Sequence, residues 1–195
     1  MRLALFDFDG TITTQETLTD FLIFAKGIIN WLLKIIMLSP WFAGFKLGFI
    51  SREKVKEAFF QAFLHQWPAA NYHQLALRYS KEKLPPLIKT SALDRIKWHQ
   101  SQGDHVIIIS ASLEDWLQYW CEQRHLDLIA GKVEIKDGYL TGKLLLKDCY
   151  GPEKVNRIKQ TIDLKKYDYI YAYGNTAGDY AMLELANEKY YRFFK

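Results

Sequence analysis

The stretch Leu3-Ala4-Leu5-Phe6-Asp7-Phe8-Asp9-Gly10-Thr11 decides the fold of this 195-residue chain. Apart from Asp7, residues 3–8 form a short apolar run, which is typical of a strand buried on both faces of a parallel sheet. Two acids flank Phe8, and a carboxylate beside a buried strand costs desolvation free energy unless it is paired or bound to a metal. An aspartate that only caps a turn is the alternative, but two acids followed by Gly-Thr fit it poorly. The stretch therefore predicts a buried strand that ends in a functional polar site.

Strand-like and helical patterns alternate along much of the chain, with long connections between the strands. This alternation favours a doubly wound α/β sheet, that is, a Rossmann-like core. Lys136-Asp137-Gly138 lies between two strand-like runs, and Asp-Gly at such a place predicts a hairpin. The predicted strands are Leu3–Phe8, His105–Ile109, Val133–Ile135, Tyr139–Leu146, Tyr167–Tyr173 and Tyr190–Phe193, and the predicted core helices are Ala92–Gln102, Ser112–Arg124, Pro152–Ile162 and Gly178–Asn187.

Residues 14–80 interrupt the alternation with a pattern that is helical and rich in aromatic residues. Proline and polar residues divide this region into three or four predicted helices. The breaks between them are predicted at Ser39-Pro40, around Ser51 and at Trp67-Pro68. We therefore expect a core of residues 1–13 and 81–195, with an all-helical cap of residues 14–80 inserted after the first strand.

The composition favours a folded chain that binds a small anionic substrate and no nucleic acid. Hydrophobic residues make up 49% of the chain, which is enough for a substantial core. The 26 basic and 22 acidic side chains leave a net charge of +4, with no basic block. Cys121 and Cys149 match no disulfide framework and no zinc-binding spacing, so we expect buried thiols in a reducing compartment. Because the N-terminus shows no secretory signal pattern, we expect a cytoplasmic protein.

Polar residues follow three of the predicted strands at the point where each strand ends. These groups are residues 7–11, residues 110–112 and residues 174–179. Ligands of open parallel sheets bind beyond the carboxyl ends of the strands, so we expect the three groups to lie together. Within the second group we expect Ser110 to face the ligand and Ser112 to cap the following helix.

These residues resemble the haloacid dehalogenase-like superfamily, whose members are mainly phosphatases with an aspartate nucleophile. Four short motifs occur in the order of that family and cover nearly the whole chain. The helical insertion and the hairpin resemble the phosphoserine phosphatase-like subgroup. The matching segments are Asp7-Phe8-Asp9-Gly10-Thr11, Ser110 after Ile107-Ile108-Ile109, Gly151-Pro152-Glu153-Lys154-Val155, and Gly174-Asn175-Thr176-Ala177-Gly178-Asp179.

The resemblance implies a role for each matching residue. Asp7 is implied as the nucleophile that forms an aspartyl-phosphate, and Asp9 as the general acid and base. Lys154 is implied as the cation that neutralises the transferring group, with Lys147 and Lys159 as alternatives. The implied phosphate-binding groups are Gly10, Thr11, Ser110 and Ala111.

The resemblance also implies Mg²⁺ as the cofactor, since this ion prefers oxygen ligands. The position after Gly174 is commonly aspartate in the family, whereas this chain has Asn175. An amide oxygen can still bind the metal but brings no charge, so we expect weaker metal binding, with Asp179 compensating directly or through water. The implied ligands are Asp7, the backbone carbonyl of Asp9, Asn175 and Asp179.

Two functions are compatible with these features. The first is a magnesium-dependent phosphomonoester phosphatase that acts on a small phosphorylated metabolite or on a lipid phosphate head group. The second is a catalytically weak or inactive regulatory protein that binds a phosphate ligand, because Asn175 weakens the metal site. Asp9 favours phosphoryl chemistry over dehalogenation, since a dehalogenase does not need a second acid at this position.

The predicted cap contains two features that bear on the substrate. Glu16, nine residues after Asp7, lies near the position of a glutamate that contacts the substrate amine in phosphoserine phosphatases; a solvent-facing helix acid is the alternative. A long apolar run predicts either core packing or a hydrophobic mouth that contacts lipid or a membrane surface. Lys26, Lys34 and Lys46 would favour anionic lipid. The run consists of Trp31, Leu32, Leu33, Ile35, Ile36, Met37, Trp41, Phe42, Phe45 and Phe49.

Overall fold

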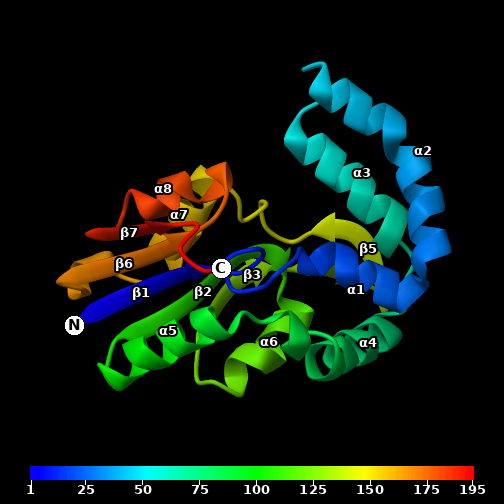
Figure 1. Ribbon diagram of the computed structural model, residues 1–195. Helices are drawn as coiled ribbons and strands as arrows, with labels where there is room; N and C mark the ends of the chain where they lie inside the picture. Colours follow the sequence, from blue (N-terminus) through cyan, green and yellow to red (C-terminus); the bar gives the residue numbers. More distant parts are fainter.

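A five-stranded sheet forms the centre of the computed structural model, which describes residues 1–195 (Figure 1). The strand order is β3-β2-β1-β6-β7, and every neighbouring pair is parallel. The predicted doubly wound α/β core is therefore confirmed, with the first strand at its centre. The strands are β1 (Arg2–Asp7), β2 (His105–Leu113), β3 (Asp127–Gly131), β6 (Tyr169–Gly174) and β7 (Glu188–Tyr191).

Both faces of the sheet are covered by helices, which explains why residues 3–6 of β1 are all apolar. Figure 1 shows α5 and α6 on one face and α7 and α8 on the other. Alternate residues of a strand point to opposite faces, so Phe6 joins the larger core cluster and Leu5 the smaller one. Cys121 and Cys149 are free and buried, one in each cluster. The helices are α5 (Thr90–Ser101), α6 (Glu114–Glu122), α7 (Pro152–Thr161) and α8 (Tyr180–Leu183), with 3-10 turns at Pro85–Leu87, Leu164–Lys166 and Ala177–Asp179.

Four helices follow β1 in the region predicted as a helical insertion. Ser51 caps α3 by accepting a hydrogen bond from the backbone amide of Lys54, and Pro68 precedes α4, so two predicted breaks are confirmed. The predicted break at Ser39-Pro40 is wrong, because Pro40 lies inside α2. Pro40 removes one hydrogen bond, to the carbonyl of Ile36, on an exposed side of the helix where solvent can replace it. The helices are α1 (Thr17–Lys26), α2 (Ile28–Lys46), α3 (Arg52–Leu64) and α4 (Ala69–Glu82).

The predicted hairpin is confirmed as β4 (Val133–Lys136) and β5 (Tyr139–Leu144). Asp137 and Gly138 both have positive φ, as a two-residue hairpin turn requires. The backbone amide of Gln66 donates to the carbonyl of Leu140 at 2.9 Å, and that of Ala69 donates to Gly138 at 2.9 Å. These bonds attach the hairpin to the segment between α3 and α4.

The core elements differ from the prediction at several boundaries. β3 (Asp127–Gly131) was not predicted, because its sequence contains only three consecutive apolar residues before a glycine. The helix predicted from Ser112 begins at Glu114, because β2 continues to Leu113 with an irregular register after Ile109. The final helix is a single turn, and β7 begins two residues before the predicted Tyr190.

The apolar run in α2 and the loop after it lies largely on the surface. Trp31, Ile35 and Phe42 are partly buried and pack against the larger core cluster. The other members of the run are exposed; they are Leu32, Leu33, Ile36, Met37, Trp41, Phe45 and Phe49. Core packing therefore accounts for only one side of this helix.

Candidate active site

The carboxyl ends of three adjacent strands bring the three predicted polar groups together. Asp7 is paired with Ile109 on one side, so Ser110 follows directly next to the end of β1. Phe6 is paired with Tyr173 on the other side, so Gly174 and the residues after it also lie beside Asp7. This edge of the sheet is the expected ligand-binding edge of a doubly wound fold.

A cavity of about 550 Å³ opens at this edge. Its core side is charged, and its other side is formed by α1, α2 and α3. The predicted site residues that line it are Asp7, Asp9, Glu16, Ala111, Lys154, Asn175 and Asp179. Its other lining residues include the apolar side chains Leu18, Phe42, Phe45, Val55 and Phe59 and the basic side chains Arg52 and Lys56. The cavity thus combines a polar floor with a largely apolar wall.

Asp7, the last residue of β1, lies on the floor of the cavity and is 6% exposed. Its Oδ1 is 2.5 Å from Nζ of Lys154, and its Oδ2 accepts a hydrogen bond from Oγ1 of Thr11 at 2.7 Å. Burial raises the pKa of Asp7 to about 6, although the positive charge of Lys154 opposes this rise. The carboxylate therefore remains mostly ionised at neutral pH, which is the form that a nucleophile needs.

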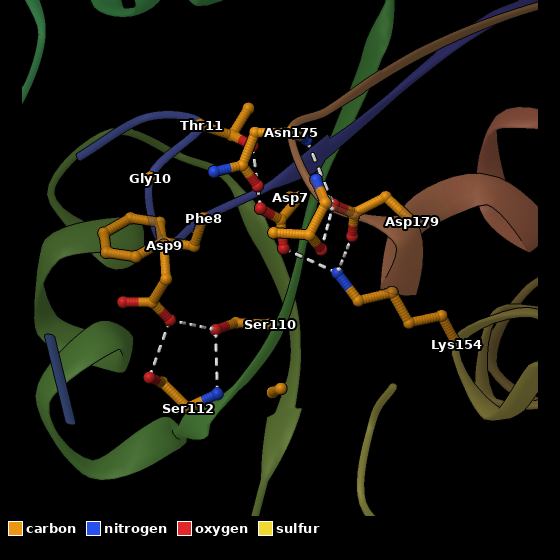
Figure 2. A network of polar contacts seen from close by, with 12 residues as sticks. Asp7, Phe8, Asp9, Gly10, Thr11, Ser110, Ser112, Lys154, Asn175 and Asp179 are labelled. Carbon is orange, nitrogen blue, oxygen red and sulfur yellow. Dashed lines mark hydrogen bonds and ion pairs between the residues drawn. The ribbon is translucent and has the colours of Figure 1, made fainter. Parts of the chain in front are cut away.

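Lys154 joins the first and last motifs through two buried ion pairs. Its Nζ is 2.5 Å from Oδ1 of Asp7 and 2.6 Å from Oδ1 of Asp179 (Figure 2). Burial alone would lower the pKa of Lys154, but the two carboxylates outweigh burial and raise it above its usual range. The alternatives Lys147 and Lys159 are exposed and do not line the cavity.

Asp179 holds the loop after β6 in place as well as pairing with Lys154. Its Oδ2 accepts hydrogen bonds from the backbone amides of Asn175 at 3.0 Å and Thr176 at 2.9 Å, and from Oγ1 of Thr176 at 3.0 Å. Burial opposes its charge, but the ion pair with Lys154 and these hydrogen bonds hold the pKa of Asp179 below its usual range. Both carboxylate oxygens of Asp179 are therefore already engaged within the protein.

Asp9 points away from Asp7 and into a second polar network (Figure 2). Its Oδ1 accepts hydrogen bonds from the amide and Oγ1 of Thr17, at 2.7 and 2.6 Å. Its Oδ2 accepts hydrogen bonds from Oγ of Ser112 at 2.7 Å and Oγ of Ser110 at 3.1 Å. Ser112 is therefore not the cap of α6, as the sequence predicted; it binds Asp9 and lines the cavity. Four hydrogen bonds from the protein thus occupy both oxygens of the Asp9 carboxyl.

The predicted phosphate-binding residues surround the two acids. Ser110 is fully buried, and besides donating to Asp9 it accepts a hydrogen bond from the amide of Ser112 at 3.0 Å. The carbonyl of Ala111 accepts a hydrogen bond from Nζ of Lys56 at 3.0 Å. The amide of Gly10 donates to Oγ1 of Thr13 at 3.0 Å, whereas the backbone amides of Asp9 and Thr11 donate to no protein acceptor. These last two amides are available to an anion.

Asn175 is the residue that indicates an oxygen-binding ligand. Its side chain lies beside Gly10, where an added Cβ would be 2.2 Å from Nδ2 of Asn175 at a φ of +72°, so only glycine fits. Its Oδ1 is buried without a hydrogen-bond partner, which costs free energy unless a ligand satisfies it. Figure 2 places this amide next to Asp7 and Thr11.

The oxygen atoms near Asn175 are suitable ligands for Mg²⁺, a hard cation that binds oxygen. No group of three or more His, Cys, Asp or Glu side chains is arranged to hold a metal ion. Amide and backbone carbonyl oxygens would therefore have to complete the ligand set around Asp7. Asn175 and the carbonyl of Asp9 are the residues that could supply them.

Glu16 lies at the mouth of the cavity, directly before α1. The residue as a whole is exposed, so it is not a member of the buried floor. Partial burial of its carboxyl, and then the negative charges of Asp9, Asp7 and Asp179, raise the pKa of Glu16 to about 7. Its charge therefore changes near neutral pH, within reach of a bound substrate.

Sequence reasoning missed several residues that shape this site. Thr17 is fully buried, bonds to Asp9 and accepts a hydrogen bond from Nε1 of Trp116 at 3.1 Å. Arg52 lies over the ring of Tyr150 at 3.6 Å, and both residues line the cavity. No local pattern marks these residues: Thr17 is eight residues from Asp9, and the contacts of Trp116 with Thr17 and of Arg52 with Tyr150 join segments that are far apart in the chain.

Comparisons with known proteins agree with this geometry. The sequence profile of the haloacid dehalogenase-like hydrolase family matches residues 4–184. Protein CicA of Caulobacter vibrioides is 28% identical over 197 residues, which cover 99% of this chain and 86% of the relative. A probable phosphatase of Mycobacterium tuberculosis is 25% identical over 190 residues, which cover 93% of this chain and 65% of that protein.

Solved structures share the fold over nearly the whole chain. A Bordetella pertussis protein of unknown function has a TM-score of 0.77 and 20% identity, covering 95% of this chain and 86% of that one. A phosphoserine phosphatase, solved as an analogue of its phospho-aspartyl intermediate, has a TM-score of 0.68 and 20% identity, covering 96% of this chain and 84% of that one. The predicted family and its phosphoserine phosphatase-like fold are thus confirmed. This chain is a hydrolase that belongs to the haloacid dehalogenase-like family.

Proposed function

We propose that this protein is a magnesium-dependent phosphomonoesterase that uses Asp7 as its nucleophile and passes through an aspartyl-phosphate. The observation that carries the proposal is the buried pair of Asp7 and Lys154, 2.5 Å apart on the cavity floor. A carboxylate kept ionised by a buried cation is suited to attack phosphorus, and the cation also neutralises the transferring group. The fold of phosphoserine phosphatase and the name of the Mycobacterium tuberculosis relative support the same reaction class.

The reaction consists of two displacements at phosphorus. In the first, an oxygen of Asp7 forms a bond to phosphorus while the ester bond breaks, and the leaving oxygen takes a proton from Asp9. In the second, water attacks the aspartyl-phosphate, Asp9 accepts a proton from that water, and the bond between Asp7 and phosphorus breaks. The products are an alcohol and inorganic phosphate, and both aspartates return to their starting state.

Asp9 has to change its hydrogen-bond partners before it can act as an acid. Both of its carboxyl oxygens accept hydrogen bonds from the protein, so neither is free to face a leaving oxygen. Thr17 opens α1, so a movement of the helical region would withdraw both bonds to Oδ1 at once. The proposal therefore includes closure of a cap, residues 14–80, over a core made of residues 1–13 and 81–195.

The proposed ligands of Mg²⁺ are Asp7, the carbonyl oxygen of Asp9 and Asn175. The orphaned Oδ1 of Asn175 supports this assignment, since it needs a partner. When bound, the ion supplies positive charge that polarises the phosphoryl oxygens. Asp179 is better suited to a supporting role, because both of its oxygens bind Lys154 and the loop after β6.

The proposed substrate carries one phosphate monoester, on a small metabolite or on a lipid head group, in the cytoplasm or at its membrane surface. The free amides of Asp9 and Thr11, together with the hydroxyl of Ser110, would hold the phosphate. Glu16 at the cavity mouth would face the part of the substrate that carries the phosphate. The absence of a basic block in the sequence argues against nucleic acid as the substrate.

Hydrolysis of an aryl phosphate tests the proposal directly. We expect turnover by the wild type with Mg²⁺, loss of turnover with a chelator, and no turnover or trapped phosphoenzyme in Asp7→Asn. Asp94→Asn, which changes an exposed acid on α5, is the matched control and should keep full activity. Unchanged hydrolysis by the Asp7→Asn variant would exclude Asp7 as the nucleophile. Binding of inorganic phosphate without any hydrolysis would instead support the regulatory alternative.

A further inference from the structure

The side of α2 that faces away from the rest of the chain is apolar and uncovered. We call it the outer face of α2 and define it by Ile29, Leu33, Ile36 and Met37, which are 73%, 62%, 67% and 60% exposed. These positions recur at helical spacing and so form one stripe. The opposite side of the helix is also apolar and packs against the core. A helix that is apolar on both sides needs a second apolar environment for its outer side.

The net charge of the segment that contains this face selects the kind of environment. From Phe21 to Arg52 the chain has no aspartate or glutamate, although it has 22 acids in total. Lys26, Lys34, Lys46 and Arg52 are the charged residues of this segment. An anionic surface is therefore attracted to it, whereas a second copy of the chain would bring like charges together.

Contacts of the inner side indicate that α2 lies along a membrane surface and does not cross the bilayer. By length and composition alone, Ile28–Lys46 could span a membrane, and 6% of the residues of its apolar stretch are fully buried in the fold. However, Nζ of Lys34 donates to the carbonyl of Ala62 on α3 at 2.5 Å, and Leu38 is buried. Figure 1 shows α2 paired with α3 along the outer edge of the molecule. Spanning would break these contacts, whereas burial of one side at an interface keeps them.

The same helix also forms part of the wall of the active-site cavity. Phe42 and Phe45 of α2 line the cavity together with Phe59 of α3. The opposite side of the cavity ends at Asp7 and Lys154. The space therefore runs from an apolar wall on the inner side of α2 to a charged floor, which matches an amphiphile with a phosphate at its polar end.

We propose that the outer face of α2 inserts into the interfacial region of an anionic bilayer, and that the substrate is a lipid phosphate monoester drawn from it. The acyl part of the lipid lies along Phe42 and Phe45, and its phosphate reaches Asp7. This inference rests on the proposed phosphatase function and names its substrate class. The chemistry is the same two-step hydrolysis, with the lipid alcohol as the leaving group.

Vesicle flotation of the full chain tests the membrane contact. We expect the wild type to float with vesicles that contain phosphatidylcholine and anionic phosphatidylglycerol, and to bind pure phosphatidylcholine far more weakly. The triple variant Leu33→Gln, Ile36→Gln, Met37→Gln should lose about tenfold or more of this partitioning. The matched control replaces three exposed apolar residues on other surfaces; it is Leu77→Gln, Ile135→Gln, Leu145→Gln, and it should float like the wild type.

Two activity measurements separate this inference from the proposed function. The triple variant of α2 should hydrolyse a soluble aryl phosphate like the wild type but hydrolyse a diacylglycerol phosphate in anionic vesicles about tenfold more slowly or worse. Equal flotation of the triple variant and the wild type would overturn the membrane contact. A wild type that dimerises through this face in light scattering and ignores vesicles would also overturn it. Aryl phosphate turnover without any lipid phosphate turnover would overturn the substrate class and leave the phosphatase proposal intact.

Discussion

Replacing Lys154 with methionine isolates the contribution of the buried ion pairs. Its Nζ is 2.5 Å from Asp7 and 2.6 Å from Asp179, and its side chain is 2% exposed. Methionine has a similar length but no charge, so the substitution leaves two buried carboxylates without their shared cation. Removal of one partner of a buried ion pair costs about 3–5 kcal/mol. We therefore expect the free energy of unfolding to fall by about 3–5 kcal/mol at about pH 8, together with a loss of turnover.

The pH dependence of the lost stability gives a sharper test than the size of the loss. Without Lys154, the pKa of Asp7 should rise further above its present value of about 6, while the unfolded chain keeps the ordinary aspartate pKa. A group whose pKa is raised in the folded state favours folding at low pH, and this contribution is lost as the pH rises through the folded pKa. The deficit of the variant relative to the wild type should therefore shrink when the pH falls from about 8 to about 5.

Urea unfolding followed by tryptophan fluorescence measures both effects. Lys159→Met, which changes an exposed lysine on the same helix, is the control and should change stability by no more than about 0.5 kcal/mol. Adding Asp7→Asn to Lys154→Met should restore part of the stability, because it removes one buried charge. A Lys154→Met protein as stable as the wild type, or equally destabilised at both pH values, would refute the reasoning.

Three further substitutions test other parts of the site. Gly10→Ala should lower stability by about 1–3 kcal/mol and abolish turnover, since alanine is strained at a φ of +72° and its Cβ would displace the Asn175 amide; thermal unfolding and aryl phosphate hydrolysis measure this. Thr17→Val should lower the free energy of unfolding by about 1–3 kcal/mol, because Oδ1 of Asp9 loses a buried hydroxyl donor. Glu16→Gln should weaken the rise of KM with pH around neutrality, because deprotonation of Glu16 (pKa about 7) repels an anionic substrate and glutamine cannot ionise.

Each of these substitutions has a control in the same chain. Gly103 has the same φ of +72° but nothing within 4 Å, so Gly103→Ala measures backbone strain without the contact to Asn175. Thr14→Val changes an exposed threonine near Thr17, and Glu57→Gln changes an exposed acid of α3. Equal loss of turnover in the two alanine variants would contradict the role of the Asn175 contact. A KM profile of Glu16→Gln identical to that of the wild type would contradict the effect of its charge.

Much of the core could be predicted because its signals are local. Residues 3–6 are apolar at every position, as expected of a strand covered on both faces. Asp137-Gly138 predicts its hairpin from two adjacent residues, since the turn needs positive φ at both. The acids at positions 7 and 9 and the lysine at 154 could be named because they stand in recognisable motifs. The approach of Ser110 and of the loop after β6 to Asp7 follows from the parallel register of β1, β2 and β6.

The sequence by itself therefore determined the doubly wound core, four of the five strands of its sheet and the polar groups that follow three of them. Only the tertiary structure placed Thr17 and Ser112 against Asp9, left Oδ1 of Asn175 without a partner, and turned one apolar side of α2 to the surface. The physical reason is the range of each interaction. Strand burial and turn geometry depend on neighbouring residues, whereas a hydrogen bond or an exposed face depends on segments that the fold alone brings together or keeps apart.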